Sequence, residues 1–241
     1  MTDALFLAPV AGTAVGDLVR VDGDEGHHAV TVRRIRPGEQ VLLADGHGHG
    51  VRGVVEHISR AEMAVRVTEV VREPERAHRW TAVQALTKGT RAGLAIEAVT
   101  ELGVDEVLAW PAARSVVRWD AKTDVGLAKW RATVREAAKQ SRRLAVPAVE
   151  LATTEQVIER IRRADLALVL DGAAGVPLHA VEVPGGGEVL FIVGPEGGIT
   201  PEELGRFRQA GAYTVRIARD VLRASTAGVV ALAQLQALAR V

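Results

Sequence analysis

The stretch FIVGPEGGIT, Phe191–Thr200, joins a predicted strand to a predicted helix through a glycine-rich loop. Its apolar run Phe191–Val193 is short, rich in residues that favour β-structure, and ended by a glycine and a proline. Such a run is typical of a buried strand that leaves its sheet. Thr200, Pro201 and Glu203 match a helix N-cap, a proline at the first helical position and the glutamate of a capping box. A strand, a loop and a helix in this order predict part of an α/β sheet.

The glycine-rich loop itself has two interpretations. In open α/β sheets, ligands bind outside the carboxyl ends of the strands, where glycines allow the backbone to approach the ligand. The alternative is a tight turn that needs positive φ at Gly197 or Gly198 and serves only to connect the two elements. The stretch alone supports both interpretations equally.

The composition of the chain excludes several classes of protein and of site. The chain has 241 residues, 48% of them hydrophobic, enough for one large domain or two smaller ones. The absence of cysteine excludes disulfides, thiolate nucleophiles and cysteine-ligated metal sites. No apolar run is long enough to span a bilayer and the first residues lack the order of a secretory signal, so we expect a soluble cytoplasmic protein. Because the formal net charge is zero, a nucleic-acid partner would have to bind a local basic patch.

Two patterns divide the chain. From Leu18 to Val70, short runs rich in β-formers alternate with turn clusters such as DGDEG and DGHGHG, which predicts a small β-barrel. The charged segment Val71–Trp80 is predicted to be a linker. Beyond it, strand-like and helical runs alternate, which predicts a mainly parallel sheet covered by helices. One helix is expected to end at Gly103 and a long one to run from about Asp124 to Leu144. The other predicted helices cover residues 153–164, 200–211 and 225–239, and the strands are TAVQAL, EVLAW, LALVLDG, EVLFIV and YTVRIA.

Three strand ends in the second part lead into loops that could bind a ligand. They are LDGAAG from Leu170, GPEGG after Val193 and ARDVLRAST after Ile217. None has the spacing G-x-G-x-x-G, and G-K-[ST] occurs nowhere, so neither a dinucleotide nor a triphosphate site is predicted. Closely spaced loops could instead hold a planar heterocycle and a charged tail, as an adenosine-containing donor requires.

Five segments, in this order, resemble the RsmE family. They are HHAVTVRRIRPGEQVLLADGHG, KGTRAGLAIEAVTELGVDEVLAWPAARSVV, REAAKQSRRLAVP, FIVGPEGGITPEE and IARDVLRASTAGVVAL. Members of this family are SPOUT-class methyltransferases that methylate N3 of a uridine in 16S (small-subunit) ribosomal RNA. The resemblance covers almost the whole chain.

The resemblance implies a fold, a cofactor and partners. Residues 1–72 would form a PUA-like RNA-binding β-barrel, and residues 78–241 a SPOUT α/β domain with a trefoil knot, a rare exception to the rule against threaded chains. The protein would be a homodimer that uses S-adenosylmethionine, and its partner would be small-subunit ribosomal RNA or the assembled 30S subunit.

The resemblance also implies which residues hold the cofactor. They are Leu170, Asp171, Gly172, Gly194, Pro195, Glu196, Gly197, Gly198, Ile217, Ala218, Val221, Leu222, Arg223, Thr226 and Ala227. The chain departs from the family where members usually read L-G-x-R-I-L-R-T-E-T-A. Here Ala218, Asp220, Ala224 and Ser225 replace the glycine, arginine, threonine and glutamate of that pattern. No carboxylate at position 225 can therefore serve as a base.

Methylation of uridine N3 needs a base for a weakly acidic proton and a cation for the charge that O2 and O4 then share. Arg223 and Arg114 lie in matched motifs and are the candidate catalytic residues for charge stabilisation. The base could be Glu101, Asp171, Glu196 or water. Glu101 also fits an ordinary surface glutamate in the last turn of a helix.

Two groups of basic residues are candidates for RNA contact. They are Arg33, Arg34, Arg135, Lys139, Arg142 and Arg143. The first two match the family's H-H-x-x-x-V-x-R region, and the others recur along one face of a predicted helix, where a solvated face is the alternative. His47 and His49 lie on a glycine loop without a third ligand nearby, so we predict no metal.

Three functions remain to be separated. The leading hypothesis is an S-adenosylmethionine-dependent ribosomal RNA methyltransferase. The second is a non-catalytic RNA-binding protein on the same scaffold, which the altered LRAST segment suggests. The third, a small-molecule α/β enzyme with a nucleotide cofactor, rests only on the glycine-rich loop.

Overall fold

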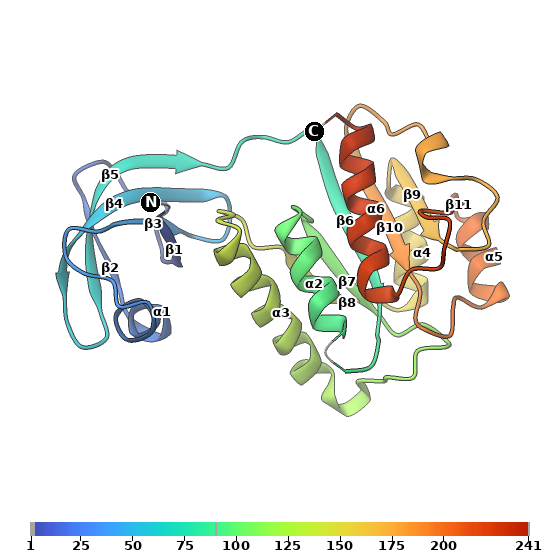
Figure 1. Cartoon of the computed structure of the whole chain (residues 1–241), viewed down its shortest axis with the longest axis horizontal. Helices are drawn as coiled ribbons and strands as arrows, with labels where there is room; N and C mark the ends of the chain where they lie inside the picture. Colours follow the sequence, from blue (N-terminus) through green and yellow to red (C-terminus); the bar gives the residue numbers. More distant parts are fainter. Residues whose placement is uncertain (1–2, 90, 241) are drawn as a thin grey trace. The chain divides into compact units, whose positions relative to one another are not determined.

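The computed structural model describes residues 3–89 and 91–240, and the chain forms two compact units (Figure 1). The first unit contains the residues up to Glu75 together with Arg135–Val146. The second contains Arg76–Val134 and the residues from Pro147 onward. The long helix α3, Thr123–Gln140, therefore begins in the second unit and ends in the first.

Five strands form the sheet of the first unit, in the order β1-β3-β4-β5-β2. They are β1 (Ala4–Leu7), β2 (Leu18–Val21), β3 (Gln40–Ala44), β4 (His49–Ile58) and β5 (Met63–Arg72). β1 pairs with β3 in parallel, and the other pairs are antiparallel. Phe6, Leu43 and Met63 are at most 1% exposed and lie in its core. The β-rich pattern thus predicts β2 to β5, whereas β1 precedes the region in which strands were expected.

A short helical segment in the first unit was not predicted. It consists of α1 (Gly23–His27) and a π-helical turn (His28–Val32). The letters DGDEG are typical of a turn, and Val30 and Val32 favour strands, so local preference favours neither helix. Gly26 permits α1 to lie against the sheet, because a Cβ there would overlap the carbonyl oxygens of Val21 and Ala61. The helix α1 therefore depends on the close packing of Gly26 against these carbonyl groups rather than on local sequence preference.

Six parallel strands form the sheet of the second unit, in the order β11-β9-β10-β6-β7-β8. They are β6 (His78–Ala85), β7 (Glu106–Trp110), β8 (Ala148–Leu151), β9 (Leu166–Leu170), β10 (Gly187–Val193) and β11 (Tyr213–Val215). Besides the first part of α3, the helices are α2 (Arg91–Glu101), α4 (Thr154–Arg163), α5 (Pro201–Gln209) and α6 (Ala224–Leu238). The predicted alternation of strands and helices around a parallel sheet is confirmed.

Strand β10 is buried on both faces of this sheet. Leu190 and Ile192 pack in one core cluster with Phe207 of α5 and with apolar residues of α4. Residues of the opposite parity face α6, since a Cβ on Gly228 would lie 3.4 Å from Val193 and 3.5 Å from Phe191. Helices on both faces explain why β10 is a continuous apolar run rather than an alternating one.

Three boundaries differ from the prediction. The predicted linker Val71–Trp80 is shorter than expected, because β5 continues to Arg72 and β6 begins at His78, which leaves residues 73–77 as the connection. Helix α3 ends at Gln140 instead of Leu144, since Arg142 adopts a φ of 59° in the left-handed region and ends the helical path. Strand β8, which follows Pro147, was missed because AVEL is short and lies at the edge of the sheet.

Two predicted helix boundaries agree with the structure. Gly103 follows α2 with a φ of +97°, as expected of a glycine that ends a helix. The capping box of α5 is formed by Thr200 and Glu203, with Pro201 in its first turn. Among the described residues, no helix is both long enough and apolar enough to cross a membrane.

A buried carboxylate attaches the returning segment Arg135–Val146 to the rest of the first unit. Glu25 Oε1 accepts hydrogen bonds from Arg135 Nη2 at 2.9 Å and Lys139 Nζ at 3.0 Å, and Oε2 accepts one from the backbone of Leu7 at 3.3 Å. Burial raises the pKa of Glu25, but the hydrogen bonds from Arg135 and Lys139 outweigh it and hold this pKa below its usual value. The folded unit is therefore stabilised by the charged form of Glu25.

We predict that Glu25→Gln lowers the free energy of unfolding by about 2 kcal/mol at pH 7, because the buried ammonium of Lys139 then keeps the largely exposed carboxylate of Glu136, 2.9 Å away, but loses its buried carboxylate partner. A carboxyl whose pKa is depressed by folding stabilises the protein above its unfolded pKa, about 4.3, and loses that effect as the pH falls through the folded pKa. The difference between wild type and variant should therefore be complete at pH 7 and shrink below about pH 4.

Urea unfolding at several pH values measures this difference. The control is Asp24→Asn, which changes an exposed neighbouring carboxylate in the same helix and should cost no more than about 0.5 kcal/mol. Equal stability of the two variants at pH 7 would contradict the role of Glu25.

Candidate active site

Three strands of the second unit end at the same level of the sheet. Leu170, the last residue of β9, is the register partner of both Val193 in β10 and Val215 in β11. Because parallel strands end at the same edge, the loops that follow leave the sheet side by side. These loops begin at Asp171, Gly194 and Arg216, and they contain the three predicted loops LDGAAG, GPEGG and ARDVLRAST, of which LDGAAG starts at the strand end Leu170.

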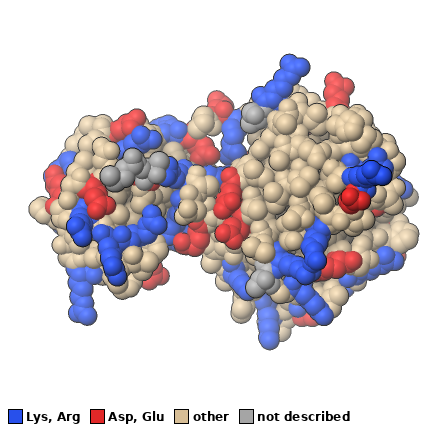
Figure 2. All heavy atoms as spheres, in the orientation of Figure 1, with Lys and Arg blue, Asp and Glu red and all other residues tan. Residues whose placement is uncertain are grey.

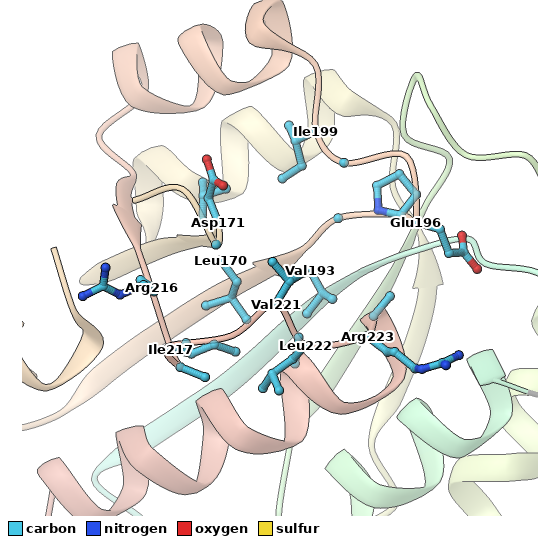
Figure 3. Close-up of a pocket in the computed structure, with 18 of the residues that line it drawn as sticks. Leu170, Asp171, Val193, Glu196, Ile199, Arg216, Ile217, Val221, Leu222 and Arg223 are labelled. Atoms are coloured by element: carbon cyan, nitrogen blue, oxygen red, sulfur yellow. The ribbon is translucent and has the colours of Figure 1, made fainter. Parts of the chain in front are cut away.

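A pocket of about 590 Å³ lies between these loops (Figure 3). Every predicted cofactor residue except Gly197 and Thr226 lines it. The lining residues that were not predicted are Thr87, Arg91, Val169, Ala173, Val193, Ile199, Leu204, Arg216, Asp220, Ala224 and Ser225. Thr87 follows the end of β6, the neighbour of β10, so the parallel order of strands would have placed it here had that order been known.

The interior of the pocket is apolar and its margin is charged. In Figure 3, Leu170, Val193 and Leu222 lie around the centre, and Ile199 points into it from the opposite side. Asp171, Glu196, Arg216 and Arg223 also line the pocket and carry their charged groups outward. Such a site can bury a flat apolar group and present backbone and charged groups to the ends of a ligand.

Val221 is an exposed apolar residue in the lining of the pocket. Its residue surface is 88% exposed although its side chain points into the pocket. Gly172 makes room for it, since a Cβ at that position would lie only 3.3 Å from Val221 Cγ2. Together with the other apolar residues of the lining, it adds to the apolar surface that a ligand could contact.

The turn interpretation of the glycine-rich loop holds at Gly198, and the ligand-binding interpretation stays a prediction. Gly198 has a φ of +74°, so the turn needs a glycine there, and its amide donates to the carbonyl of Pro195 at 2.8 Å. Gly197 does not have positive φ and does not line the pocket; instead, a Cβ there would lie 3.2 Å from Arg114 Cβ. Gly194 lines the pocket, and a Cβ there would lie 2.8 Å from Ile199 Cγ1.

Of the two arginines predicted to be catalytic, one lines the pocket. Arg223 precedes α6 as its N-cap residue, and its carbonyl accepts the amides of Thr226 and Ala227 at 2.9 Å. Thr226 thus belongs to the start of this helix. Arg114 does not line the pocket; its Nη1 donates to the carbonyl of Gly197 at 3.1 Å.

Of the candidate bases, Asp171 and Glu196 line the pocket, whereas Glu101 is exposed at the end of α2 and does not. Asp171 Oδ1 accepts the amide of Ala173 at 2.9 Å, so this carboxylate also shapes its own loop.

Comparison with known proteins identifies the kind of domain in each unit. Residues 74–236 match a family model described as an RNA methyltransferase domain, and residues 21–68 match an RNA methyltransferase PUA domain. A protein of Mycobacterium tuberculosis named ribosomal RNA small subunit methyltransferase E is 47% identical over 227 residues, 90% of this chain and 85% of that one. The chain belongs to this methyltransferase E family.

Solved structures agree with the family. The methyltransferase E of Neisseria gonorrhoeae, bound to S-adenosyl methionine, aligns with a TM-score of 0.87 and 26% identity over 98% of each chain. The methyltransferase Lpg2936 of Legionella pneumophila, in complex with the same cofactor, gives 0.85 and 25% over 98% of each chain. These relatives confirm a PUA-like unit followed by a SPOUT-type α/β unit.

The four residues in which this member departs from the family pattern all face the pocket. Ala218, Asp220, Ala224 and Ser225 are among its lining residues. The departures therefore change the wall of the site directly, and a serine of the pocket wall stands where the pattern has a glutamate at position 225.

The structure divides the basic residues that were predicted to contact RNA. Arg33, Arg34 and Arg142 are exposed, and the last two have φ values of 55° and 59°. Lys139 and Arg143 are each only 9% exposed. The helical face is thus not a continuous solvated track, because Lys139 is buried and α3 ends at Gln140, before Arg142 and Arg143. On the side of the molecule that Figure 2 draws, Lys and Arg are interspersed with Asp and Glu, in keeping with a net charge of zero.

The two histidines of the DGHGHG loop are held by a carboxylate. Asp45 Oδ1 accepts the amides of His47 at 2.7 Å and His49 at 3.1 Å, and Asp45 Oδ2 lies 2.9 Å from His49 Nδ1. Within residues 3–89 and 91–240, no three His, Cys, Asp or Glu side chains are grouped as a metal site would need.

We predict that Gly198→Ala destabilises the protein by about 1 kcal/mol, because an L side chain resists positive φ although nothing crowds this position. Gly205→Ala is the matched control: it lies inside α5, has free space for a Cβ, and should be neutral or stabilise by up to about 1 kcal/mol. Denaturant unfolding of both variants measures the difference. Equal effects would show that the loop does not depend on this glycine.

Proposed function

We propose that this protein transfers the methyl group of S-adenosylmethionine to N3 of a uridine in small-subunit ribosomal RNA. The observation that carries the proposal is the pocket at the carboxyl edge of β9, β10 and β11, lined by the loops that the family resemblance assigns to the cofactor. Relatives named ribosomal RNA small subunit methyltransferase E, and solved relatives that bind S-adenosyl methionine, support the same activity.

The residues present fit such a cofactor. The apolar lining of Leu170, Ile217 and Leu222 suits an adenine ring, and the backbone of the glycine-rich loop offers donors and acceptors without side chains in the way. Carboxylates and guanidinium groups both line the pocket, as a ligand with an ammonium, a sulfonium and a carboxylate requires. When bound, S-adenosylmethionine supplies the electrophilic methyl group.

The chain itself must manage charge on the uracil ring. Loss of the N3 proton leaves negative charge shared between O2 and O4, and a planar guanidinium can meet two such acceptors. Arg223 is exposed and lines the pocket, and in Figure 3 its side chain points to the same side as that of Glu196. We therefore assign charge stabilisation to Arg223 and uptake of the proton, directly or through water, to Glu196.

The first unit would recruit the RNA. Its exposed arginines Arg33, Arg34 and Arg142 are suited to phosphate contacts, and Arg135 is half-exposed beside Glu25. Lys139 and Arg143 would support this surface from below rather than contact RNA, since both are buried.

We also infer that the protein acts as a cytoplasmic homodimer and that its second unit is knotted. Support for threading comes from the segment after β11: Arg216 donates its amide to the carbonyl of Val176 at 2.8 Å and accepts the amide of Leu178 at 2.9 Å. The chain then passes to Ile217, whose carbonyl accepts from Gln234 of α6 at 2.9 Å. The segment Arg216–Ile217 thus has residues 176–178 on one side and α6 on the other, as expected of a segment that passes through a knot.

We predict that Arg223→Lys reduces the rate of methyl transfer about a hundredfold with little loss of cofactor affinity. Lysine keeps the charge but loses the planar fork, and removal of one stabilising donor typically costs about 3 kcal/mol of transition-state energy. Arg219→Lys is the matched control, because Arg219 is exposed in the same loop but does not line the pocket. Single-turnover kinetics and cofactor titration separate the two effects, and a full-rate Arg223→Lys enzyme would contradict the catalytic role.

The proposed activity is tested by incubating the protein with labelled S-adenosylmethionine and small ribosomal subunits, or their free RNA, from cells that lack the enzyme. Mass spectrometry should find one N3-methylated uridine. A methyl group on carbon or ribose would overturn the assignment to N3. Binding of cofactor and RNA without turnover would favour the non-catalytic alternative.

A further inference from the structure

The carboxylate of Glu203 joins two loops of the second unit. Its Oε2 accepts the amide of Thr200 at 3.0 Å and the hydroxyl of Thr200 at 2.9 Å, which closes the capping box of α5. Its Oε1 accepts the amide of Ala113, 90 residues away in sequence, at 2.7 Å. Glu203 is 6% exposed, so both sets of bonds are shielded from water. One side chain thus fixes the start of α5 and the loop after β7.

The helix cap itself does not need the second oxygen. Helix α4 has the same capping box, formed by Thr153 and Gln156, with the amide of Thr153 donating to Gln156 Oε1 at 2.8 Å. A glutamine, with a single acceptor oxygen, therefore suffices for the cap. Glu203 also accepts the amide of Ala113, and the contacts described for Gln156 include no such bond to another loop.

The loop after β7 meets the glycine-rich loop at a second point. Arg114 Nη1 donates to the carbonyl of Gly197 at 3.1 Å, and the missing Cβ of Gly197 leaves room for Arg114. Arg118 holds the same loop by donating to the carbonyls of Pro111 and Ala113, each at 3.0 Å. The segment Ala113–Arg114 is therefore fixed in place and braces the glycine-rich loop.

The braced loop is one wall of the pocket. Gly194, Pro195, Glu196, Gly198 and Ile199 line the pocket, whereas Glu203, Ala113 and Arg114 do not. The wall is anchored at one end by β10, at the other by the capping box, and in the middle by Arg114. Side chains outside the pocket thus set the position of the backbone that faces the ligand.

We propose that Glu203 is a positioning residue for the cofactor site, and that Arg114 works with it through the carbonyl of Gly197 rather than on the uracil ring. The inference relies on the proposed function only for the identity of the ligand. The junction keeps the glycine-rich loop in one conformation before the ligand arrives, so ligand binding does not have to order this loop.

The test is Glu203→Gln. The glutamine keeps one acceptor for Thr200, as Gln156 does in α4, and turns its amide toward the N–H of Ala113, so the cap remains and the bond between loops is lost. We expect the dissociation constant for S-adenosylmethionine, measured by calorimetry, to rise about tenfold, with a smaller change in the rate at saturating cofactor. Gln156→Ala is the control: it removes the bond from the amide of Thr153 to Gln156 Oε1 in the capping box of α4 and should leave cofactor affinity unchanged.

A second variant probes the same junction from the other side. Arg114→Met removes the bond to Gly197 at an exposed position and should also weaken cofactor binding. If both residues act through one wall, the double variant Glu203→Gln/Arg114→Met should lose less affinity than the product of the single effects. If the loss of affinity in the double variant equals the product of the two single losses, or if Arg114→Met binds the cofactor like the wild type, the shared role is overturned.

Amide hydrogen exchange separates this inference from the proposed function. In the protein without ligand, Glu203→Gln should speed exchange at the amide of Ala113 and in the glycine-rich loop. If the wild type does not bind S-adenosylmethionine, the proposed function fails while this measurement still decides on the junction. Unchanged exchange at Ala113, or wild-type cofactor affinity in Glu203→Gln, would overturn the positioning role.

Discussion

The site depends on the parallel pairing of three strands in register. Leu170 pairs with both Val193 and Val215, so the chain leaves β9, β10 and β11 at one level of the sheet. A parallel sheet requires a long connection between neighbouring strands, and each connection returns the chain to the same edge. The loops that follow therefore converge whatever their sequences are. What the sequence of each loop decides is whether the converging backbones leave a pocket or fill the space.

Single carboxylates then hold segments that are distant in sequence. Glu25 attaches the end of α3 to the first unit, Glu73 Oε2 accepts the amides of Leu144 and Ala145 at 3.0 Å, and Glu203 joins α5 to the loop after β7. In each case a buried or half-buried carboxylate meets several donors at once. A carboxylate has two oxygens with room for about four donors, which makes it suited to such junctions. The functional consequence differs, because only the Glu203 junction lies behind the pocket wall.

Much of the second unit could be predicted from the sequence because its elements carry strong local signals. The capping box at Thr200, the glycine at Gly103 and the apolar run of β10 each have a local physical cause. The cofactor residues were predicted from the family resemblance, and the structure brings nearly all of them to one pocket. By contrast, α1 depends on Gly26 fitting against carbonyls of distant residues, which no local pattern reveals. The burial of Lys139 likewise follows from Glu25, more than 100 residues away, and its helical spacing alone gave the impression of an exposed face.

The most direct test of this account is hydrogen exchange of the full chain with and without S-adenosylmethionine. If the pocket between the three loops holds the cofactor, its addition should slow exchange in residues 171–173, 194–199 and 217–227 together, while the five-stranded sheet of the first unit stays unchanged. Protection confined to one of these loops, or protection that appears only outside the second unit, would contradict it.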